Sequence, residues 1–335
     1  VPVVNGIPAS AIILQRSDIE QLEHDPDGAW RSFARAKITD GAAYSEGLTY
    51  REDLYPKLTW NLGPYLSASY FDPDQPVAAD VGLKLSAKYE ISPGLILSGA
   101  IQKKLVGNKS SLKRISNSKI QHVRSDGNLY NKAGDPAITH LTMAYFFRPG
   151  KDLYGRVTAG YLERMYGGIS AEVLWKPVNS KFALGAELNY VKQRDFNQLF
   201  GFQSYQVATG HVSGYWEMGN GFHGQVDVGR YLAGDWGATL SLDREFRNGW
   251  RIGAYATFTT VSFNDFGEGS FDKGIRFTIP LEHFTGRPTN KTYAATLQPL
   301  SRDGGARLKV SDRLYETVRA QHGSNLRNSW GRFWR

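Results

Sequence analysis

The sequence predicts an all-β protein whose main part is an antiparallel transmembrane β-barrel of about 12 strands. Three observations support this prediction. Apolar and polar residues alternate through most of residues 58–279, the alternating segments are long, and short connections alternate with longer ones. A barrel strand turns alternate side chains towards lipid and lumen, and it needs roughly 9–11 residues to cross a membrane.

The alternation is clearest in residues 181–193. Every second residue from Phe182 to Tyr190 is apolar, and small, polar or charged residues occupy the opposite face. The same pattern recurs in residues 80–90, 236–243 and 250–258. A period of two with one apolar face indicates strands that are covered by an apolar medium on one side only.

A soluble β-sandwich would alternate in the same way, so strand length and aromatic placement decide between the two architectures. Many segments run for about 10–13 residues, whereas strands of soluble sheets typically have about 5–6. Aromatic residues gather near the expected strand ends, at Trp175, Tyr190, Trp216, Trp236 and Trp250. These positions fit the aromatic girdles at the two interfaces of a membrane barrel.

The connections favour the same architecture. Tight turns alternate with longer or more variable links, as in bacterial outer-membrane barrels. The turns lie at 91–94, 148–152, 176–180, 217–221 and 247–249, and the links at 72–79, 106–137, 165–167, 193–204, 232–235 and 261–271. The first strand is Leu58–Phe71, taken as one strand through Gly63-Pro64, and the last ends near Ile279. The even count places both ends of the barrel on the periplasmic side.

Bulk composition excludes several classes of protein. The mean hydropathy is −0.41, and no apolar run approaches the roughly 18–20 residues of a spanning helix. There is no cysteine, which excludes disulfides, thiolate metal sites and a cysteine nucleophile. The histidines show no metal-ligand spacing, and we expect neither a metal nor another cofactor.

Two smaller parts flank the barrel, which we assign to residues 55–280. Residues 1–54 predict a small α/β segment with a hairpin through Asn5-Gly6 and helices starting near Ser17 and Gly28. Residues 281–335 predict a basic tail with short strands at 293–297 and 306–310 and a helix near 312–321. We expect this tail to be periplasmic or to lie in the lumen.

The net charge of +8 is unevenly distributed. The tail carries ten Lys and Arg against four Asp and Glu, and residues 106–137 carry six against two. The second segment predicts a basic loop with Lys109, Lys113, Arg114, Lys119 and Arg124. A basic loop and tail suit anionic sugars or lipopolysaccharide phosphates, although solvated charge is the plainer interpretation. No motif accompanies the charge that would indicate nucleic-acid binding.

Several long phrases of the sequence match a known family. They are residues 227–239 (DVGRYLAGDWGAT), 266–274 (FGEGSFDKG), 302–306 (RDGGA) and 329–335 (SWGRFWR), with shorter phrases at 56–61, 122–126, 199–202 and 209–211. Through these phrases the chain resembles the YjbH (GfcD-related) family of bacterial exopolysaccharide proteins over nearly its whole length.

The resemblance implies an outer-membrane protein that serves exopolysaccharide or group 4 capsule secretion. Family members look like lipoproteins of about twice this length with two barrels, so this chain would correspond to the second barrel. The family offers no catalytic motif that can be transferred. We therefore expect a non-enzymatic component that passes or organises polysaccharide at the cell surface. Its partners would be membrane lipid, lipopolysaccharide, anionic polysaccharide and secretion proteins of the envelope.

The strand pattern also predicts which polar residues line the lumen. The candidates carry charges of both signs, which could pair across the barrel or line a polar path for sugar. They are Lys84, Lys88, Arg156, Glu172, Glu187, His211, Asp227, Asp243, Glu245, Arg251 and Arg276. His140 also points inward, and we expect the tail or the basic loop to occupy part of the lumen.

Two other functions stay open at this point. Asp243 and Glu245 lie two residues apart on one inward face, and paired carboxylates could act as acid and base on a glycosidic bond. Carboxylates are also expected in any polar lumen without catalysis. A passive porin is the other alternative, since a barrel of about 12 strands lies between the packed small barrels and the water-filled ones.

Overall fold

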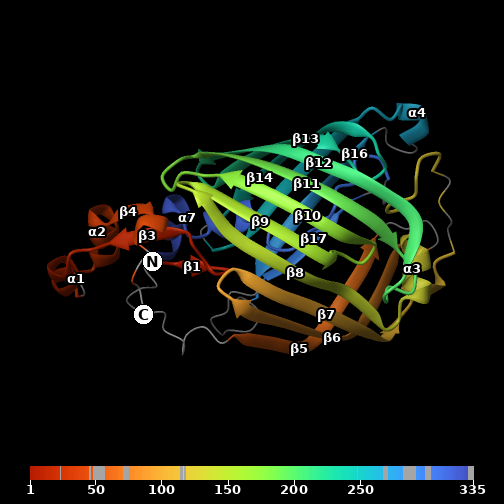
Figure 1. Cartoon of the computed structure of the whole chain (residues 1–335), viewed down its shortest axis with the longest axis horizontal. Coiled ribbons are helices and arrows are strands. Elements are labelled where there is room, and N and C mark those ends of the chain that lie inside the picture. Colours follow the sequence, from red (N-terminus) through yellow and green to blue (C-terminus); the bar gives the residue numbers. More distant parts are fainter. Residues whose placement is uncertain are drawn as a thin grey trace.

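The computed structural model describes residues 1–22, 24–44, 47, 57–70, 75–113, 116, 118–246, 248–266, 271–281, 292–298 and 303–330. Its main element is one sheet of 13 antiparallel strands, each paired with its neighbours along the chain. The sheet curls into a nearly closed barrel (Figure 1). Its edge strands are β5 (Leu58–Tyr70) and β17 (Thr292–Leu297).

The intervening strands are β6 (Val77–Ser92), β7 (Leu95–Gly107), β8 (Ala137–Gly150), β9 (Leu153–Tyr161), β10 (Tyr166–Trp175), β11 (Phe182–Arg194), β12 (Phe202–Gly219), β13 (Phe222–Arg230), β14 (Trp236–Glu245), β15 (Arg251–Thr259) and β16 (Asp272–Pro280). The predicted count of about 12 is met by β5 to β16. The sheet has a thirteenth strand because the tail strand β17 pairs with β16 instead of leaving the barrel.

The predicted single strand through Gly63-Pro64 is confirmed, since β5 is continuous and pairs with β6 along its whole length. Pro64 has no N–H to donate to a ladder, and proline within a sheet is therefore confined to edge strands and bulges. As β5 is an edge of the sheet, Pro64 is compatible with an unbroken strand there.

The outer surface of the barrel is apolar. In β11 every second side chain is buried, and the intervening ones face outwards, among them Leu188 and Tyr190, which are 73% and 55% exposed. Trp60 on β5 and Val212 on β12 are similarly exposed, at 68% and 62%. Large exposed apolar side chains along successive strands need an apolar environment, which a membrane supplies. No helix among the described residues is long and apolar enough to span a membrane.

The connections divide the barrel into two ends, as predicted. Short connections follow β6, β8, β10, β12 and β14, and we call this side the turn end. The other side, the loop end, carries the longer segments. Loop 108–136 contains η3 (Lys109–Ser111) and α3 (Gly127–Ala133), and loop 260–271 contains α4 (Phe263–Phe266).

The N-terminal segment forms the predicted α/β unit. Its elements are β1 (Val3–Val4), β2 (Ile7–Pro8), β3 (Ser10–Ile13), α1 (Arg16–Leu22), α2 (Gly28–Arg35), β4 (Lys37–Asp40) and η1 (Ala42–Tyr44). Asn5 and Gly6 make the β1–β2 turn with φ values of 49° and 76°. The expected helix start at Ser17 is displaced, because Ser17 lies inside α1.

This unit packs on the turn end of the barrel (Figure 1). Arg148, at the β8–β9 turn, donates to Asp40 Oδ2 at 2.6 Å, and the Tyr154 hydroxyl donates to the Ala9 carbonyl at 3.0 Å. A Cβ on Gly6 would lie 1.9 Å from the backbone nitrogen of Gly94 in the β6–β7 turn, so only glycine allows this approach. The N-terminal unit is too small for a core of its own, and these contacts with the barrel stabilise it.

The tail then passes back through the barrel. The β17 strand runs from the turn end towards the loop end, and the chain re-enters the lumen at Asp303, which contacts loop 108–136. It continues through α6 (Leu314–Arg319) and α7 (Gly323–Ser329) to the turn end. There Trp330 Nε1 donates to Ser32 Oγ of the N-terminal unit at 2.9 Å. Residues 303–330 therefore span the lumen from one end to the other, and we call them the lumenal tail.

Candidate functional site: a lumen filled by the chain's own tail

Apolar contacts hold the lumenal tail against one wall. Ala306, Leu308 and Val310 are buried and pack with inward side chains of β10, β11 and β12. Further along, Leu314, Tyr315 and Val318 pack with inward residues of β7 to β12 and with the N-terminal unit. Leu314 and Val318 are 0% exposed. The inward faces of these strands are mostly polar. They carry apolar residues where the tail packs against them.

Glu187 is the central carboxylate of this wall. Its oxygens accept from Arg307 at 3.0 Å and from Arg313, both on the lumenal tail. His211 Nδ1 lies 3.3 Å away on the neighbouring strand. Glu187 is 3% exposed, and buried charge is tolerated only where it is paired and hydrogen-bonded. The guanidinium groups of Arg307 and Arg313 therefore supply the ion pairs that this buried carboxylate needs.

Two further contacts continue the same pattern. Arg307 also reaches Asp227 at 2.8 Å, and Ser213 donates to this carboxylate at 2.5 Å. Arg156 pairs with Glu172 at 2.9 Å and donates to the carbonyl of Ser311 at 2.6 Å. Asp227, Arg156 and Glu172 of the wall are thus linked to the tail directly or through one intermediate group.

A second ionic cluster lies nearer the turn end. Asp243 pairs with Arg251 at 2.9 Å and with Arg276 at 3.2 Å. Arg251 also binds Glu316 of the tail at 3.1 Å. The other carboxylate of the predicted acid–base pair, Glu245, contacts Arg319 of the tail at 3.1 Å and His223 at 3.7 Å. Both carboxylates are engaged by guanidinium groups of this chain.

At the loop end, Asp303 joins the tail to loop 108–136. Its Oδ1 accepts the backbone N–H groups of Val123, Arg124 and Ser125 at 2.8, 2.8 and 3.0 Å. The Ser125 hydroxyl donates to Oδ2 at 2.6 Å. Three converging N–H groups form a compact anion site, and here the chain's own carboxylate occupies it.

At the turn end, His322 joins the tail to the N-terminal unit. Its Nε2 lies 3.3 Å from the carbonyl of Ala9 and 3.2 Å from the hydroxyl of Tyr154. Burial, with the Lys176 ammonium as a further cause, lowers the pKa of His322 to about 3. The ring is therefore neutral at physiological pH, and the contact depends on that neutral form.

Fewer cations of the basic loop are available to a ligand than the sequence suggests. Lys109 is buried and donates to Ser67 Oγ at 2.9 Å, Lys119 pairs with Asp265 at 3.0 Å, and Arg124 pairs with Glu163 at 2.8 Å. Lys113 is exposed and has an interaction of its own. Arg114 lies outside the described residues. At least three of these five cations are used inside the protein rather than offered to a ligand.

The inward residues of β5 to β8 differ from those of the filled wall. Lys84 and Lys88 keep partial exposure, and Lys88 lies 4.0 Å from Asp312 at the bend of the tail. Its ammonium also donates to Asn5 of the N-terminal unit at 2.7 Å. His140 is likewise only half-buried. Part of the lumen along β5 to β8 thus stays open to water beside the tail.

All eleven predicted lumen residues lie on the inward side, and the structure brings ten of them, all but Lys84, into contact with a charged partner. The sequence analysis did not identify the tail residues that bind them. Arg307, Arg313 and Arg319 recur at intervals of six in a basic tail that follows a barrel with inward carboxylates. That spacing is the signal which could have revealed them. No group of three or more described His, Asp or Glu side chains is arranged to hold a metal ion.

Comparison with known proteins then assigns the family. The family model of exopolysaccharide biosynthesis protein YbjH, called YjbH, matches residues 1–320. The chain belongs to the YjbH family. One curated member, the uncharacterized lipoprotein YjbH of Escherichia coli strain K12, is 34% identical over 268 residues, which is 78% of this chain and 38% of that protein. The chain therefore spans well under half of that family member's length, and the predicted resemblance to the family is confirmed.

Solved structures with some likeness to the barrel are outer-membrane proteins. The Salmonella typhi OmpF complex with daunomycin aligns with 76% of this chain and 94% of its own, at 12% identity and a TM-score of 0.37. Pseudomonas aeruginosa OccK11 (OpdR) aligns over 74% of both chains at 13% identity and a TM-score of 0.36. The family assignment rests on the sequence match and not on these structures.

Proposed function

We propose that this chain is a non-enzymatic component of exopolysaccharide secretion in the bacterial outer membrane, and that it works as a barrel closed in part by its own tail. The observation that supports the proposal most is the pairing of Glu187 with two arginines of the lumenal tail. Family membership supports the link to exopolysaccharide, and the apolar outer surface supports the membrane. Envelope secretion proteins, lipopolysaccharide and an anionic polysaccharide are the partners we propose.

The inward carboxylates support a non-enzymatic role. A general acid on a glycosidic bond needs a protonated carboxyl group, usually one in an apolar pocket. Asp243 instead lies between the guanidinium groups of Arg251 and Arg276, which occupy its oxygens. A hydrolase that uses Asp243 and Glu245 is the alternative to be tested.

The test is secretion by a bacterial strain that lacks its own copy of the gene and carries the double variant Asp243→Asn and Glu245→Gln. These changes keep side-chain shape and remove acid–base capacity. We expect exopolysaccharide to be released at the level of the unchanged protein, with normal barrel assembly on unheated gels. Loss of secretion by a correctly assembled double variant would overturn the non-enzymatic role.

Channel recordings test the tail's role against that of a passive porin. A planar bilayer containing the purified chain should show little conductance, and removal of residues 303–335 should raise it severalfold, because the tail occupies the lumen. A large, steady conductance from the complete chain would mean that the tail does not close the barrel.

A further inference from the structure

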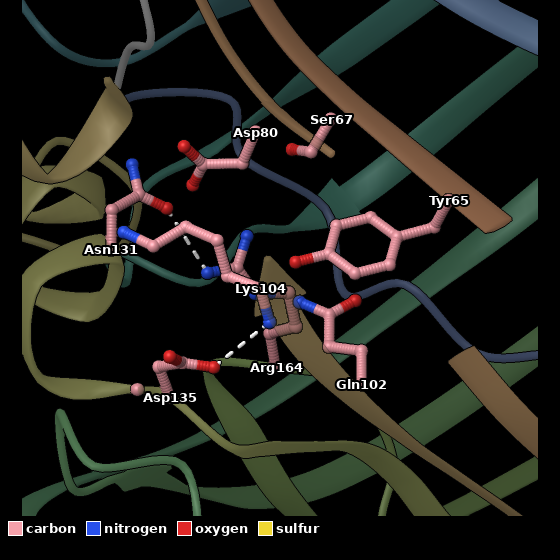
Figure 2. A pocket seen from close by; sticks show the side chains of 9 residues that line it. Tyr65, Ser67, Asp80, Gln102, Lys104, Asn131, Asp135 and Arg164 are labelled. Atoms are coloured by element: carbon pink, nitrogen blue, oxygen red, sulfur yellow. Dashed lines mark hydrogen bonds between the residues drawn. The ribbon is translucent and has the colours of Figure 1, made fainter. Parts of the chain in front are cut away.

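A polar pocket lies at the loop end, on the side of the lumen that the tail leaves open. Strands β5, β6 and β7 form one side of it. The other side is formed by α3 with the residues that follow it, and by loop 162–165. Its enclosed volume is about 20 Å³, and its mouth is open to solvent. A group of the size of a carboxylate could enter it, whereas the ring of a sugar would lie across the mouth. Figure 2 shows how Tyr65 of β5, Gln102 and Lys104 of β7, and Arg164 of loop 162–165 approach it.

The carboxylates of this pocket already have partners. Asp135 Oδ2 accepts from Lys103 at 3.0 Å, and its Oδ1 accepts the backbone N–H of Lys104 at 2.9 Å. Asp80 Oδ1 accepts the backbone N–H of Lys109 at 3.1 Å. These two acids stabilise the local structure, and their charge is offset by Lys103 and Lys109.

Two cations of the pocket, in contrast, have neutral partners. Lys104 Nζ donates to Ser110 Oγ at 3.0 Å. Arg164 donates to Gln198 Oε1 at 2.8 Å and to Asn131 Oδ1 at 3.2 Å. Among the described residues neither cation forms an ion pair. Asp135 acts on the Lys104 ammonium, and Asp80 and Glu163 act on the Arg164 guanidinium, without direct contact between the charged groups. An anion that entered the pocket would form the direct ion pair that both cations lack.

The lumenal tail adds a third cation on the same side. Lys309 is exposed, although Leu308 and Val310 on either side of it are buried. It interacts electrostatically with Arg124 and Arg164, and with Glu163 in the opposite sense. Glu163 is already paired with Arg124 at 2.8 Å. Lys309, like Lys104 and Arg164, has no ion pair within the part of the chain that the structure describes.

Neutral hydrogen-bonding groups lie beside these charges. The Tyr65 hydroxyl points towards Lys104 and Arg164 (Figure 2). Neither that hydroxyl nor the Gln102 amide has a hydrogen-bond partner among the residues whose positions are described. A hydroxyl and an amide can each bind sugar hydroxyls, and a tyrosine ring offers an apolar face for the C–H side of a sugar.

We propose that this pocket binds one carboxylate-bearing sugar unit, a uronate, of an acidic polysaccharide. Lys104 and Arg164 would hold the carboxylate, and Gln102 and Tyr65 would hold the ring hydroxyls. An inorganic anion would use the cations alone, so the neutral groups favour a sugar acid. The source of the sugar rests on the proposed function, whereas the binding itself is a property of the purified chain.

The test is calorimetric titration of the full chain in detergent with tetragalacturonate, with a neutral tetragalactose and with inorganic phosphate. We expect tetragalacturonate to bind at least about tenfold more tightly than either of the other two. Lys104→Met should weaken its binding by about 10–100-fold, because charge-assisted hydrogen bonds contribute on that scale. Tyr65→Phe, which keeps the ring, should weaken it by less than Lys104→Met.

The matched control is Lys192→Met, which removes one positive charge from the outer face of β11 and should leave binding unchanged. Assembly of each variant is checked by its migration on unheated gels. Equal affinity for the charged and neutral sugars, tighter binding of phosphate than of tetragalacturonate, or unaltered binding by an assembled Lys104→Met variant would each overturn the pocket proposal. Because no cells are involved, these results are independent of the secretion test.

Discussion

Two strands of equal length, β5 and β11, show how the two halves of the lumen differ. β5 and β11 each have 13 residues and the same alternation of faces. On β11 every inward side chain from Ala183 to Gln193 is buried, whereas on β5 every inward residue from Asn61 to Ser69 keeps some exposure. The difference arises from the lumenal tail, which packs on the β11 side and leaves the β5 side to water.

The comparison shows how one barrel can combine a fixed and an open interior. On the filled side, buried carboxylates are paired by tail arginines, and removing either partner leaves an uncompensated charge. On the open side, lysines such as Lys84 can be solvated and need no fixed partner. Changes on the filled side should therefore cost far more stability than matched changes on the open side.

The largest difference is expected for Glu187. Glu187→Ala leaves Arg307 and Arg313 without their carboxylate and should lower the free energy of unfolding by about 3–5 kcal/mol. Urea denaturation in detergent or lipid vesicles measures this change. The matched control is Glu90→Ala, at an inward and partly exposed position on β6, where we expect a change within about 0.5 kcal/mol. Equal effects at both positions would remove the distinction between the two halves.

A smaller effect is expected where the tail meets loop 108–136. Asp303→Ala leaves the backbone N–H groups of residues 123–125 without their acceptor, at a cost of about 1–3 kcal/mol. Hydrogen exchange of these amides should accelerate, while exchange in β5 and β6 stays as it was. Unchanged protection at residues 123–125 would contradict the role assigned to Asp303.

The smallest effect depends on pH at the turn end. His322 has a pKa of about 3 in the folded chain and about 6.5 when unfolded. Its contribution to stability is complete above pH 6.5 and is lost as the pH falls towards 3, because only the unfolded chain then gains a proton. The unchanged protein should lose about 1–2 kcal/mol between pH 7 and 5 relative to His322→Gln. Parallel pH–stability curves for the two proteins would contradict this assignment.

Much of the fold could be predicted because its signals are local. The period of two in residues 181–193 identifies a strand and its outward face. The positive φ values of Asn5 and Gly6 at a hairpin turn are likewise encoded by those two residues. The barrel strands, their faces, and the alternation of short and long connections followed from such signals, as did the expectation that the tail or the basic loop enters the lumen. The strand predicted at 306–310 was wrong, because this segment pairs with no strand that the structure describes and instead packs its alternate apolar side chains on the lumen wall.

The partners of the inward charges could not be predicted, because they are set by tertiary structure. Glu187 and Arg307 are 120 residues apart, and Trp330 and Ser32 are 298 apart. No local pattern specifies such contacts. The sheet's thirteenth strand was missed as a barrel strand for a related reason, since β17 has only six residues and nothing in them specifies pairing with β16.

The account depends on the position of residues 306–310, and labelling of single cysteines tests it most directly. The chain has no native cysteine, so Leu308→Cys, Lys309→Cys and Val310→Cys each supply a unique thiol. With a water-soluble maleimide and the assembled protein, we expect fast reaction at position 309 and at least about tenfold slower reaction at 308 and 310, in line with their burial. Equally fast reaction at all three positions would show a tail in free solution and an unfilled lumen.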